Sequence, residues 1–394
     1  MRRRQFLSTL ATLPALGLAG RLFAAPESSP RFLLVFLRGG YDCANVLIPY
    51  SSDFYYESRP HIAVARPDGS TNGAMRLDGE WALAPVLRRS IGAMYAAKQV
   101  AFVPFAGTED LSRSHFETQD NIECGLPPDR HGYGSGFLAR LCGVLNGRAP
   151  PIAFTDALPL SFQGGTNIPN LSLRTVGAAA FDERQSAILA DMYRGSHLQT
   201  PVSTGLELRH EVAQEFGSEM AKANRGAINA RAFALQAEHL AQLMRERYRL
   251  GFIDVGGWDT HINEGGAQGQ LANNLENLGT GLGAFAGALG DEWRHTVVVV
   301  MSEFGRTFRE NGNQGTDHGH GSAYWVLGGG IAAGRIAGEQ VHVHQASLLQ
   351  DRDFPVLNNY RSVLAGLFAR LWGLDNGQLE RIFPQSRALD LRLV

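Results

Sequence analysis

Short runs of β-branched and aromatic residues alternate along the chain with longer segments in which apolar residues recur every three or four positions. The short runs predict strands and the longer segments predict helices. This alternation is typical of an α/β fold with a mostly parallel central sheet flanked by helices. The predicted strands are residues 31–37, 100–105, 152–154, 251–255, 296–301 and 324–327.

Helical spacing is found in three segments, 83–98, 206–248 and 271–289. The longest of them is rich in Ala, Glu, Arg and Leu, and we expect one or two amphipathic helices with a break near residues 224–226. Residues 164–201 mix glycine, asparagine, proline and serine with short apolar pieces, which indicates an excursion from the sheet. The simplest organisation is therefore a single α/β domain over residues 30–394 with a helical insertion.

The first 25 residues have a different pattern. Arginines at positions 2–4 precede Phe6 and Leu7, and an uncharged apolar run follows. This is typical of a signal peptide for the twin-arginine export machinery, and the run is too short to span a bilayer comfortably. We expect cleavage near Ala24 or Ala25, a periplasmic or secreted protein, and no stable membrane span after cleavage. An uncleaved tether is the alternative. Because this route carries folded proteins, a metal could be loaded before export.

Composition removes several classes of function. The chain has 394 residues, of which 44% are hydrophobic, so it can bury a large core and is neither disordered nor fibrous. Its formal net charge is -2 and no basic block follows the first four residues, which argues against a nucleic-acid partner. Three irregularly spaced cysteines predict neither a disulfide framework nor a structural zinc module, although a bridge between Cys124 and Cys142 stays open.

Polar clusters follow three of the predicted strands and precede a fourth. They are residues 38–45, 256–261, 302–307 and 317–321, and many of the 46 glycines lie in or beside such clusters, which suggests loops that approach one another closely. Open parallel sheets bind ligands beyond the carboxyl ends of their strands. We therefore expect the functional site at this edge of the sheet.

Two pairs in these clusters have the spacing of metal ligands. Asp259 with His261, and His318 with His320, are two residues apart, so in extended backbone each pair projects to one side. Carboxylates and imidazoles are ligands of Zn²⁺ and Mn²⁺. A hydrogen-bonded loop network without an ion is the alternative. Asp42 follows the first strand and could equally be a helix N-cap.

A further candidate lies after the second strand. Ser114 and Glu117 fit a capping box, so Ser114 could simply begin a helix. The same position offers a hydroxyl to a phosphate or sulfate near free N–H groups. His115 is a candidate ligand, acid/base or packing residue. The sequence contains neither a Walker-type phosphate loop nor a GxSxG serine elbow.

With these clusters in place, the chain resembles the exported bacterial family called domain of unknown function 1501. The resemblance covers nearly everything after the signal peptide. It rests on residues 36–42, 113–116, 256–261, 302–307, 317–321 and 359–361.

That family is grouped with the alkaline phosphatase and sulfatase-like superfamily, whose members hold two metal ions at the carboxyl edge of the sheet and attack phosphate or sulfate esters. The resemblance implies an alkaline-phosphatase-like fold. It places Ser114 in the nucleophile region and implies metal ligands at Asp42, Asp259, His261, Glu303 and His318 or His320.

The sequence also departs from the superfamily pattern. Phe304 stands where a ligand histidine would follow the acid, and the spacing from Asp259 to His261 is short. The segment after Cys43 lacks the Pro and Arg of a sulfatase modification site. One divalent ion, two ions or none, with Zn or Mn preferred, therefore all remain open.

We expect an exported metal-dependent hydrolase of phosphate or sulfate esters, with Arg38 or Arg306 offsetting charge on the transferring group. The alternative is a non-catalytic periplasmic protein that keeps the fold for binding or for a structural role. A small anionic ester, or a glycan or lipid head group, is the expected partner.

Overall fold

We describe a computed structural model of the chain, in which residues 29–127, 130, 132, 134–165, 167–173, 191–196, 199 and 230–394 are placed. The expected signal peptide, most of the expected excursion at 164–201, and the first part of the 206–248 segment with its break lie outside the described residues.

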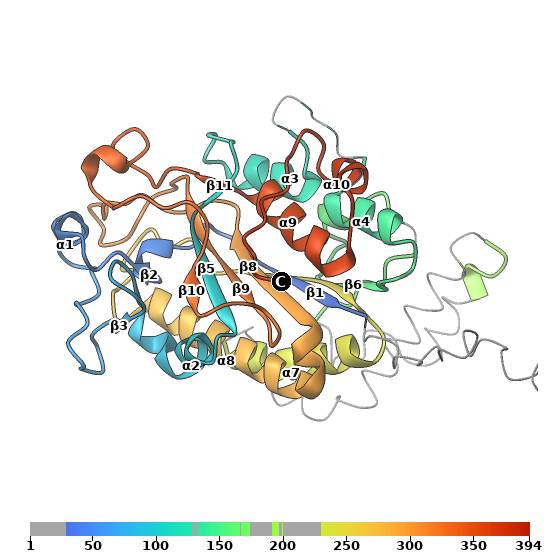
Figure 1. Ribbon diagram of the computed structural model, residues 1–394, viewed down its shortest axis with the longest axis horizontal. Helices are drawn as coiled ribbons and strands as arrows, with labels where there is room; N and C mark the ends of the chain where they lie inside the picture. The colour runs from blue at the N-terminus through green and yellow to red at the C-terminus, as the bar shows by residue number, and fades with distance from the viewer. Residues whose placement is uncertain are drawn as a thin grey trace, which may run out of the picture.

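The centre of the fold is an eight-stranded sheet in the order β10-β5-β9-β8-β1-β7-β6, with β11 paired to β5 (Figure 1). Of these strands, β9 runs antiparallel to its neighbours β5 and β8, and the other described pairings are parallel. The mostly parallel sheet is thus confirmed. The strands are β1 (Arg31–Leu37), β5 (Val100–Gly107), β6 (Pro151–Phe154), β7 (Leu250–Val255), β8 (Thr296–Ser302), β9 (Ser322–Leu327), β10 (Arg335–Ile336) and β11 (Asn358–Asn359).

All six predicted strands are present, within two residues at each end. The strands that the sequence did not predict are two residues long and too short to give a hydrophobic period. They are β10 and β11 of the main sheet, and β2 (Leu47–Ile48), β3 (Met75–Arg76) and β4 (Ala82–Leu83), which form a separate antiparallel sheet in the order β2-β4-β3.

Both faces of the sheet are covered by helices, and β1 shows why its sequence has no polar alternation. Phe32, Leu34 and Phe36 enter one hydrophobic core, and the intervening Leu33, Val35 and Leu37 enter the other. A strand buried on both faces is apolar throughout. The first core lies under α4 (Phe137–Leu145), α9 (Tyr360–Trp372) and α10 (Asn376–Ile382), and the second under α7 (Ala230–Glu246) and α8 (Gln270–Leu289).

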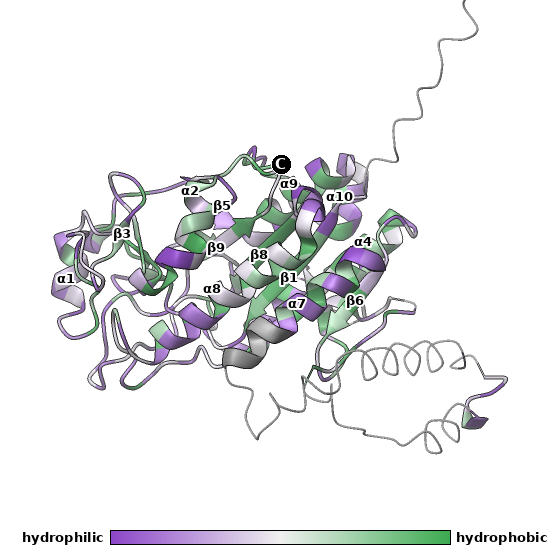
Figure 2. Ribbon diagram, turned by 90° about the horizontal axis from the view of Figure 1, so that it is seen from below, coloured by the Kyte–Doolittle hydropathy of each residue, from purple (hydrophilic) through white to green (hydrophobic). Residues whose placement is uncertain are grey.

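Helices α7 and α8 lie side by side across their face of the sheet (Figure 2). The segment predicted as one helix at 83–98 is instead divided, because Ala82 and Leu83 pair with β2 and β3 and Pro85 begins a new turn. It contains a 3₁₀ helix (Pro85–Leu87), a π-helical turn (Arg88–Gly92) and α2 (Ala93–Ala96). The remaining described helices are α1 (Asp53–Ser58), α3 (His115–Cys124) and 3₁₀ turns at Cys43–Asn45, Leu160–Phe162, Gly290–His295 and Gln345–Ser347.

The thiols of Cys43, Cys124 and Cys142 are all free, so Cys124 and Cys142 are not bridged. Among the described helices, none combines the length and the apolar character needed to cross a membrane.

Candidate metal centre

The four polar clusters meet at one edge of the sheet. Strands β1, β5, β7 and β8 are parallel, so the segments that follow them emerge on the same side. Because β9 runs the other way, the segment that precedes it, 317–321, arrives at that same edge. The backbone of Arg306 also pairs with that of His318, which joins two of the clusters directly.

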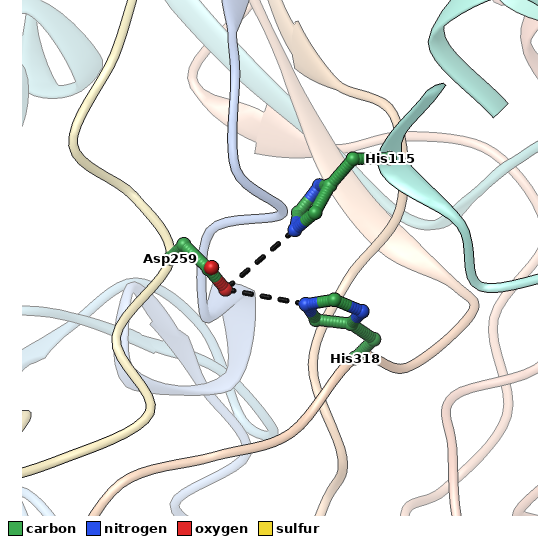
Figure 3. A group of neighbouring side chains, drawn as sticks. All are labelled: His115, Asp259 and His318. Carbon is green, nitrogen blue, oxygen red and sulfur yellow. Dashed lines mark hydrogen bonds and ion pairs between the residues drawn. The ribbon is translucent and has the colours of Figure 1, made fainter. Parts of the chain in front are cut away.

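Three histidines surround one carboxylate oxygen at this edge. Asp259 Oδ1 lies 2.9 Å from His261 Nε2, 3.3 Å from His318 Nε2 and 3.6 Å from His115 Nε2. The Nε2 atoms of His261 and His318 are 3.1 Å apart. Figure 3 shows His115 and His318 directed at Asp259 from two separate segments of the chain. Asp259 and His261 share the segment after β7, whereas His115 begins α3 and His318 precedes β9, so the fold brings three separate segments together.

The other ring nitrogen of each histidine is held by an acceptor. Nδ1 of His115 is 2.7 Å from a carboxylate oxygen of Glu303, and Nδ1 of His318 is 3.0 Å from the carbonyl oxygen of Arg113. Nδ1 of His261 is 3.2 Å from Oδ1 of Asp317. Because a carbonyl or an ionised carboxylate can only accept, each Nδ1 carries the proton when its ring is neutral.

It follows that the Nε2 lone pairs of His115 and His318 and a carboxylate oxygen of Asp259 face one small volume, and Nε2 of His261 lies beside Asp259 and His318. Such a set of acceptors repels itself unless a cation lies between its members. Ligand bonds of 2.0–2.2 Å to a tetrahedral ion would separate ligand atoms by about 3.3 to 3.6 Å, and the distances here are close to that. Metal-bound histidines also characteristically donate their second N–H to a carboxylate or carbonyl. The residues therefore fit a divalent ion, and His115, Asp259 and His318 are sufficiently close to hold one.

Glu303 lies behind His115 rather than beside the carboxylate of Asp259. Its side chain is fully buried, and the same oxygen that meets His115 accepts from Gln119 Nε2 and from the backbone N–H of Gly39, each at 2.8 Å. Burial alone would raise the pKa of Glu303, but the hydrogen bonds from His115 and Gln119 hold it below its usual range. The bond to Glu303 in turn raises the pKa of His115.

Arg306 supplies positive charge at the same carboxylate. Its buried guanidinium donates from Nη1 to Asp259 Oδ1 at 2.8 Å. Although partial burial opposes ionisation of Asp259, the charge of Arg306 and this bond keep its pKa below the ordinary value. Nε and Nη2 of Arg306 are buried without a hydrogen-bond partner in the part of the chain that the structure describes. Unpaired buried N–H groups are costly and therefore uncommon.

Asp42 is not brought into this cluster. Both of its oxygens accept from the buried guanidinium of Arg59, and its Oδ1 also caps the short 3₁₀ helix at Cys43–Asn45. Burial opposes ionisation, but Arg59 lowers the pKa of Asp42. Glu264, also buried, shares a hydrogen bond with Asp42, and burial and the charge of Asp42 raise its pKa well above normal. A helix cap and a buried ion pair account for Asp42.

Three other predicted residues have partners of their own. Ser114 is the N-cap of α3, with Oγ 3.5 Å from the N–H of Glu117. Arg38 binds Asp254, Glu123 and Gln119 at 2.7–2.9 Å. His320 is buried, which lowers its pKa, and no described bond joins its side chain to the cluster.

Phe304 forms an apolar wall of the site. Its ring centroid is 4.8 Å from that of His115 and 5.2 Å from that of His318. Gly40 has φ +61°, and a Cβ there would lie 2.4 Å from the Phe304 ring. A Cβ on Gly39 would lie 2.8 Å from the backbone nitrogen of Asp259. The glycines after β1 therefore let this loop press against both the wall and the Asp259 loop.

Sequence reasoning missed several supporting groups. Arg113 contributes its carbonyl from a left-handed conformation, φ +52°, that is uncommon for a residue with a side chain, and its guanidinium is tied to buried Asp353. Gln119 occupies the first turns of α3, where its spacing of four from His115 could have placed it on the same helix face. Asp317 lay within a recognised cluster, but nothing in the sequence paired it with His261.

The solved structures similar to this chain are remote. They include a protein in the alkaline phosphatase superfamily from Vibrio parahaemolyticus, with TM-score 0.41 and 10% identity over 87% of this chain and 66% of that one. BT1596, a 2-O GAG sulfatase, has TM-score 0.41 and 10% identity over 92% and 74%. The lipoteichoic acid synthase LtaP from Listeria monocytogenes has TM-score 0.38 and 9% identity over 92% and 76%.

The chain thus spans slightly less than two thirds of the Vibrio protein. No curated protein matches the chain significantly. A family model described as protein of unknown function (DUF1501) matches residues 29–383, which include every residue of the cluster. The chain therefore belongs to the DUF1501 family, as its sequence motifs indicated.

Proposed function

We propose that the protein is a metal-dependent hydrolase of phosphate or sulfate esters that holds one divalent ion through His115, Asp259 and His318, with His261 as a fourth ligand. The observation that supports this best is the pattern at the three imidazoles, each with its Nδ1 bound to an acceptor and its Nε2 free to bind metal. Three imidazoles and one carboxylate favour Zn over harder ions, with Mn as the second choice.

A single ion agrees best with the charges around the cluster. A second ion would need further carboxylates, but both oxygens of Asp42 are bound by Arg59 and Glu303 accepts three hydrogen bonds through one oxygen. Arg306 adds a fixed positive charge beside Asp259. The buried guanidinium thus replaces part of the charge that a second ion would provide.

The anionic substrate is inferred from the charge of Arg306. Its guanidinium is fully buried beside Asp259, so it would offset the charge of a phosphate or sulfate at the centre through space and without direct contact. Arg38 is a weaker candidate for this role because its guanidinium already binds two carboxylates. When bound, the ion would polarise the ester oxygen and make an attacking hydroxyl more acidic.

Ser114 remains our candidate for the attacking group. It stands at the N-terminus of α3, directly before His115, where the helix dipole favours developing negative charge. Its hydrogen bond to the N–H of Glu117 is long, at 3.5 Å, so its hydroxyl is not firmly committed to capping. A water molecule ordered by His115 would be the alternative nucleophile.

We also propose that the protein is exported by the twin-arginine machinery and acts in the periplasm or outside the cell. The support is the sequence of the first 25 residues alone. A fusion of residues 1–29 to a reporter that requires folded export tests this, and a pair of lysines in place of Arg3 and Arg4 should block transport.

The metal hypothesis is tested on the mature protein purified without chelator. Elemental analysis should find about one equivalent of Zn or Mn, and Asp259→Ala and His318→Ala should each lose it together with turnover of p-nitrophenyl phosphate or sulfate. His342→Ala is the matched control, because its exposed imidazole also binds a carboxylate, Glu80 at 2.8 Å, outside the cluster. Full turnover by either cluster variant would refute the assignment.

A second candidate function is a binding protein that keeps the metal without hydrolysis. Arg38 and Asp42 are bound to other side chains, and this favours a binding protein. A metal-dependent hydrolase would use Arg38 to offset the charge of the transferring group and Asp42 to bind metal. One bound equivalent of metal with no turnover across phosphate and sulfate mono- and diesters would decide for this function.

A further inference from the structure

A cavity of about 790 Å³ lies beyond the carboxyl ends of β6 and β7, beside the metal centre. Its walls come from the segment after β6, the turn after β7, α8 and Arg38. Trp258 in this wall immediately precedes Asp259, and Gln119 links Arg38 to Glu303. The volume is in the range of small-molecule sites. The cavity and the metal centre therefore share the segment after β7 and are joined by the Arg38–Gln119–Glu303 hydrogen bonds.

The cation in this wall is already neutralised. Arg38 donates to Asp254 Oδ2 at 2.7 Å, to Glu123 Oε1 at 2.9 Å and to Gln119 Oε1 at 2.8 Å. Two carboxylates thus balance one guanidinium. The other charged residue in the lining is Asp156, an acid. A cavity with this balance does not attract phosphate or sulfate.

The amides in the wall are left with acceptor oxygens. Asn274 donates its Nδ2 to the carbonyl of Gly257 at 2.8 Å, and Asn277 donates its Nδ2 to the carbonyl of Asn273 at 2.5 Å. Because both partners are carbonyls, the amide orientations are fixed by what they can accept. Each asparagine therefore keeps an acceptor oxygen and one N–H, whereas the carboxylates of Asp254 and Asp156 already accept from Arg38 and Ser172.

A wall that offers both amide oxygens and amide N–H groups, and is acidic in balance, matches a ligand with many hydroxyl groups and no negative charge. Apolar side chains, including Phe154, Leu158 and Leu278, complete the lining and suit the C–H faces of such a ligand. We propose that this cavity binds a neutral, hydroxyl-rich group, a sugar or polyol. This rests on the proposed function, in which that group is the alcohol part of the ester cleaved at the metal centre.

Binding can be measured without hydrolysis. Saturation-transfer NMR and calorimetry with free glucose, galactose, xylose and glycerol should detect binding to wild-type protein and to Asp259→Ala, which lacks the metal centre but keeps the cavity. Asn277→Leu removes one acceptor while its donor serves only its own helix. It should weaken binding about three- to tenfold, the usual effect of one neutral hydrogen bond. Thr280→Val, at an exposed position one turn further along α8, is the control and should leave binding unchanged.

The outcomes separate the two proposals. Binding that persists in Asp259→Ala and falls in Asn277→Leu supports the cavity even if no ester is hydrolysed, in which case the proposed hydrolase fails alone. If none of the four compounds binds to wild-type protein, the cavity proposal is wrong, even if p-nitrophenyl esters are turned over. Equal losses in Asn277→Leu and Thr280→Val would also overturn it.

Discussion

Partly buried His115 and fully buried Glu303 form a pair in which the imidazole Nδ1 lies 2.7 Å from a carboxylate oxygen, 188 residues away in the sequence. The pair fixes Nε2 as the ring nitrogen of His115 that can bind a metal. Glu303 has no direct bond to Asp259, so its effect on the centre passes through His115, Gln119 and Gly39.

Replacing Glu303 by glutamine should therefore lower metal affinity without removing a ligand. The neutral amide accepts more weakly from His115, and its NH₂ group would lie close to the other donors, Gln119 and the N–H of Gly39. We expect affinity for Zn to fall about 10- to 100-fold, the usual effect of a supporting carboxylate, as measured by competition with a chelator. Glu310→Gln breaks a similar pair with His61 outside the centre, and a comparable fall there would contradict the assignment.

Gly40→Ala should destabilise the fold and disturb the wall of the site. The new Cβ would both occupy a left-handed conformation and overlap the Phe304 ring. Gly147 has φ +82° and open space around it, so Gly147→Ala measures the cost of the left-handed conformation alone. We expect the free energy of unfolding to fall by about 1 kcal/mol in Gly147→Ala and by about 2 kcal/mol or more in Gly40→Ala, as measured by denaturant unfolding. Equal losses of unfolding free energy in the two variants would mean that the Phe304 ring moves aside at no cost.

Asp42→Asn tests whether Asp42 supports the fold or binds metal. The substitution removes the charge that pairs directly with the buried guanidinium of Arg59, which should cost about 3 to 5 kcal/mol of unfolding free energy. We expect the folded fraction to retain its equivalent of metal. Loss of metal from folded protein would restore Asp42 as a ligand, as the resemblance implied.

Stability should depend on the protonation of Glu264. Its pKa is raised in the folded protein, so above the unfolded value of about 4.3 the unfolded chain releases a proton that the folded chain keeps. The contribution of Glu264 to stability therefore falls as pH rises through that window, by at most about 1.4 kcal/mol per pH unit. Glu264→Gln keeps the acceptor for Thr260 and Thr316 and donates to Asp42. Urea unfolding from pH 5 to 8 should show a flatter profile for this variant, and parallel profiles would refute the raised pKa.

The sequence was a good guide to the sheet because its strands are buried on both faces and read as apolar runs. Strands such as β1 and β8 can be recognised from their own sequence, without knowing which strands they pair with. The edge of the sheet at which the candidate site lies could also be predicted from the sequence, because it depends only on strand direction. The antiparallel β9 did not prevent this, because its polar cluster precedes the strand.

The roles within the site were harder to predict. A carboxylate after a strand has the same local sequence whether it meets a metal, as proposed for Asp259, or an arginine, as Asp42 meets Arg59. His318 and His320 have equivalent local spacing, yet only His318 joins the cluster, because its Nδ1 reaches the carbonyl of Arg113. Which carboxylate and which histidine enter the cluster depends on how loops distant in the sequence are placed relative to one another, and a single sequence does not reveal this.

The central position of β1 has a consequence for biosynthesis. This first strand pairs with β7 and β8, and the Ser302 hydroxyl donates to the Leu37 carbonyl across 265 residues. A ribosome must therefore finish most of the chain before the middle of the sheet has its neighbours, and contacts of such separation close slowly. During synthesis the apolar strand β1 therefore stays without its neighbours until β7 and β8 have been made.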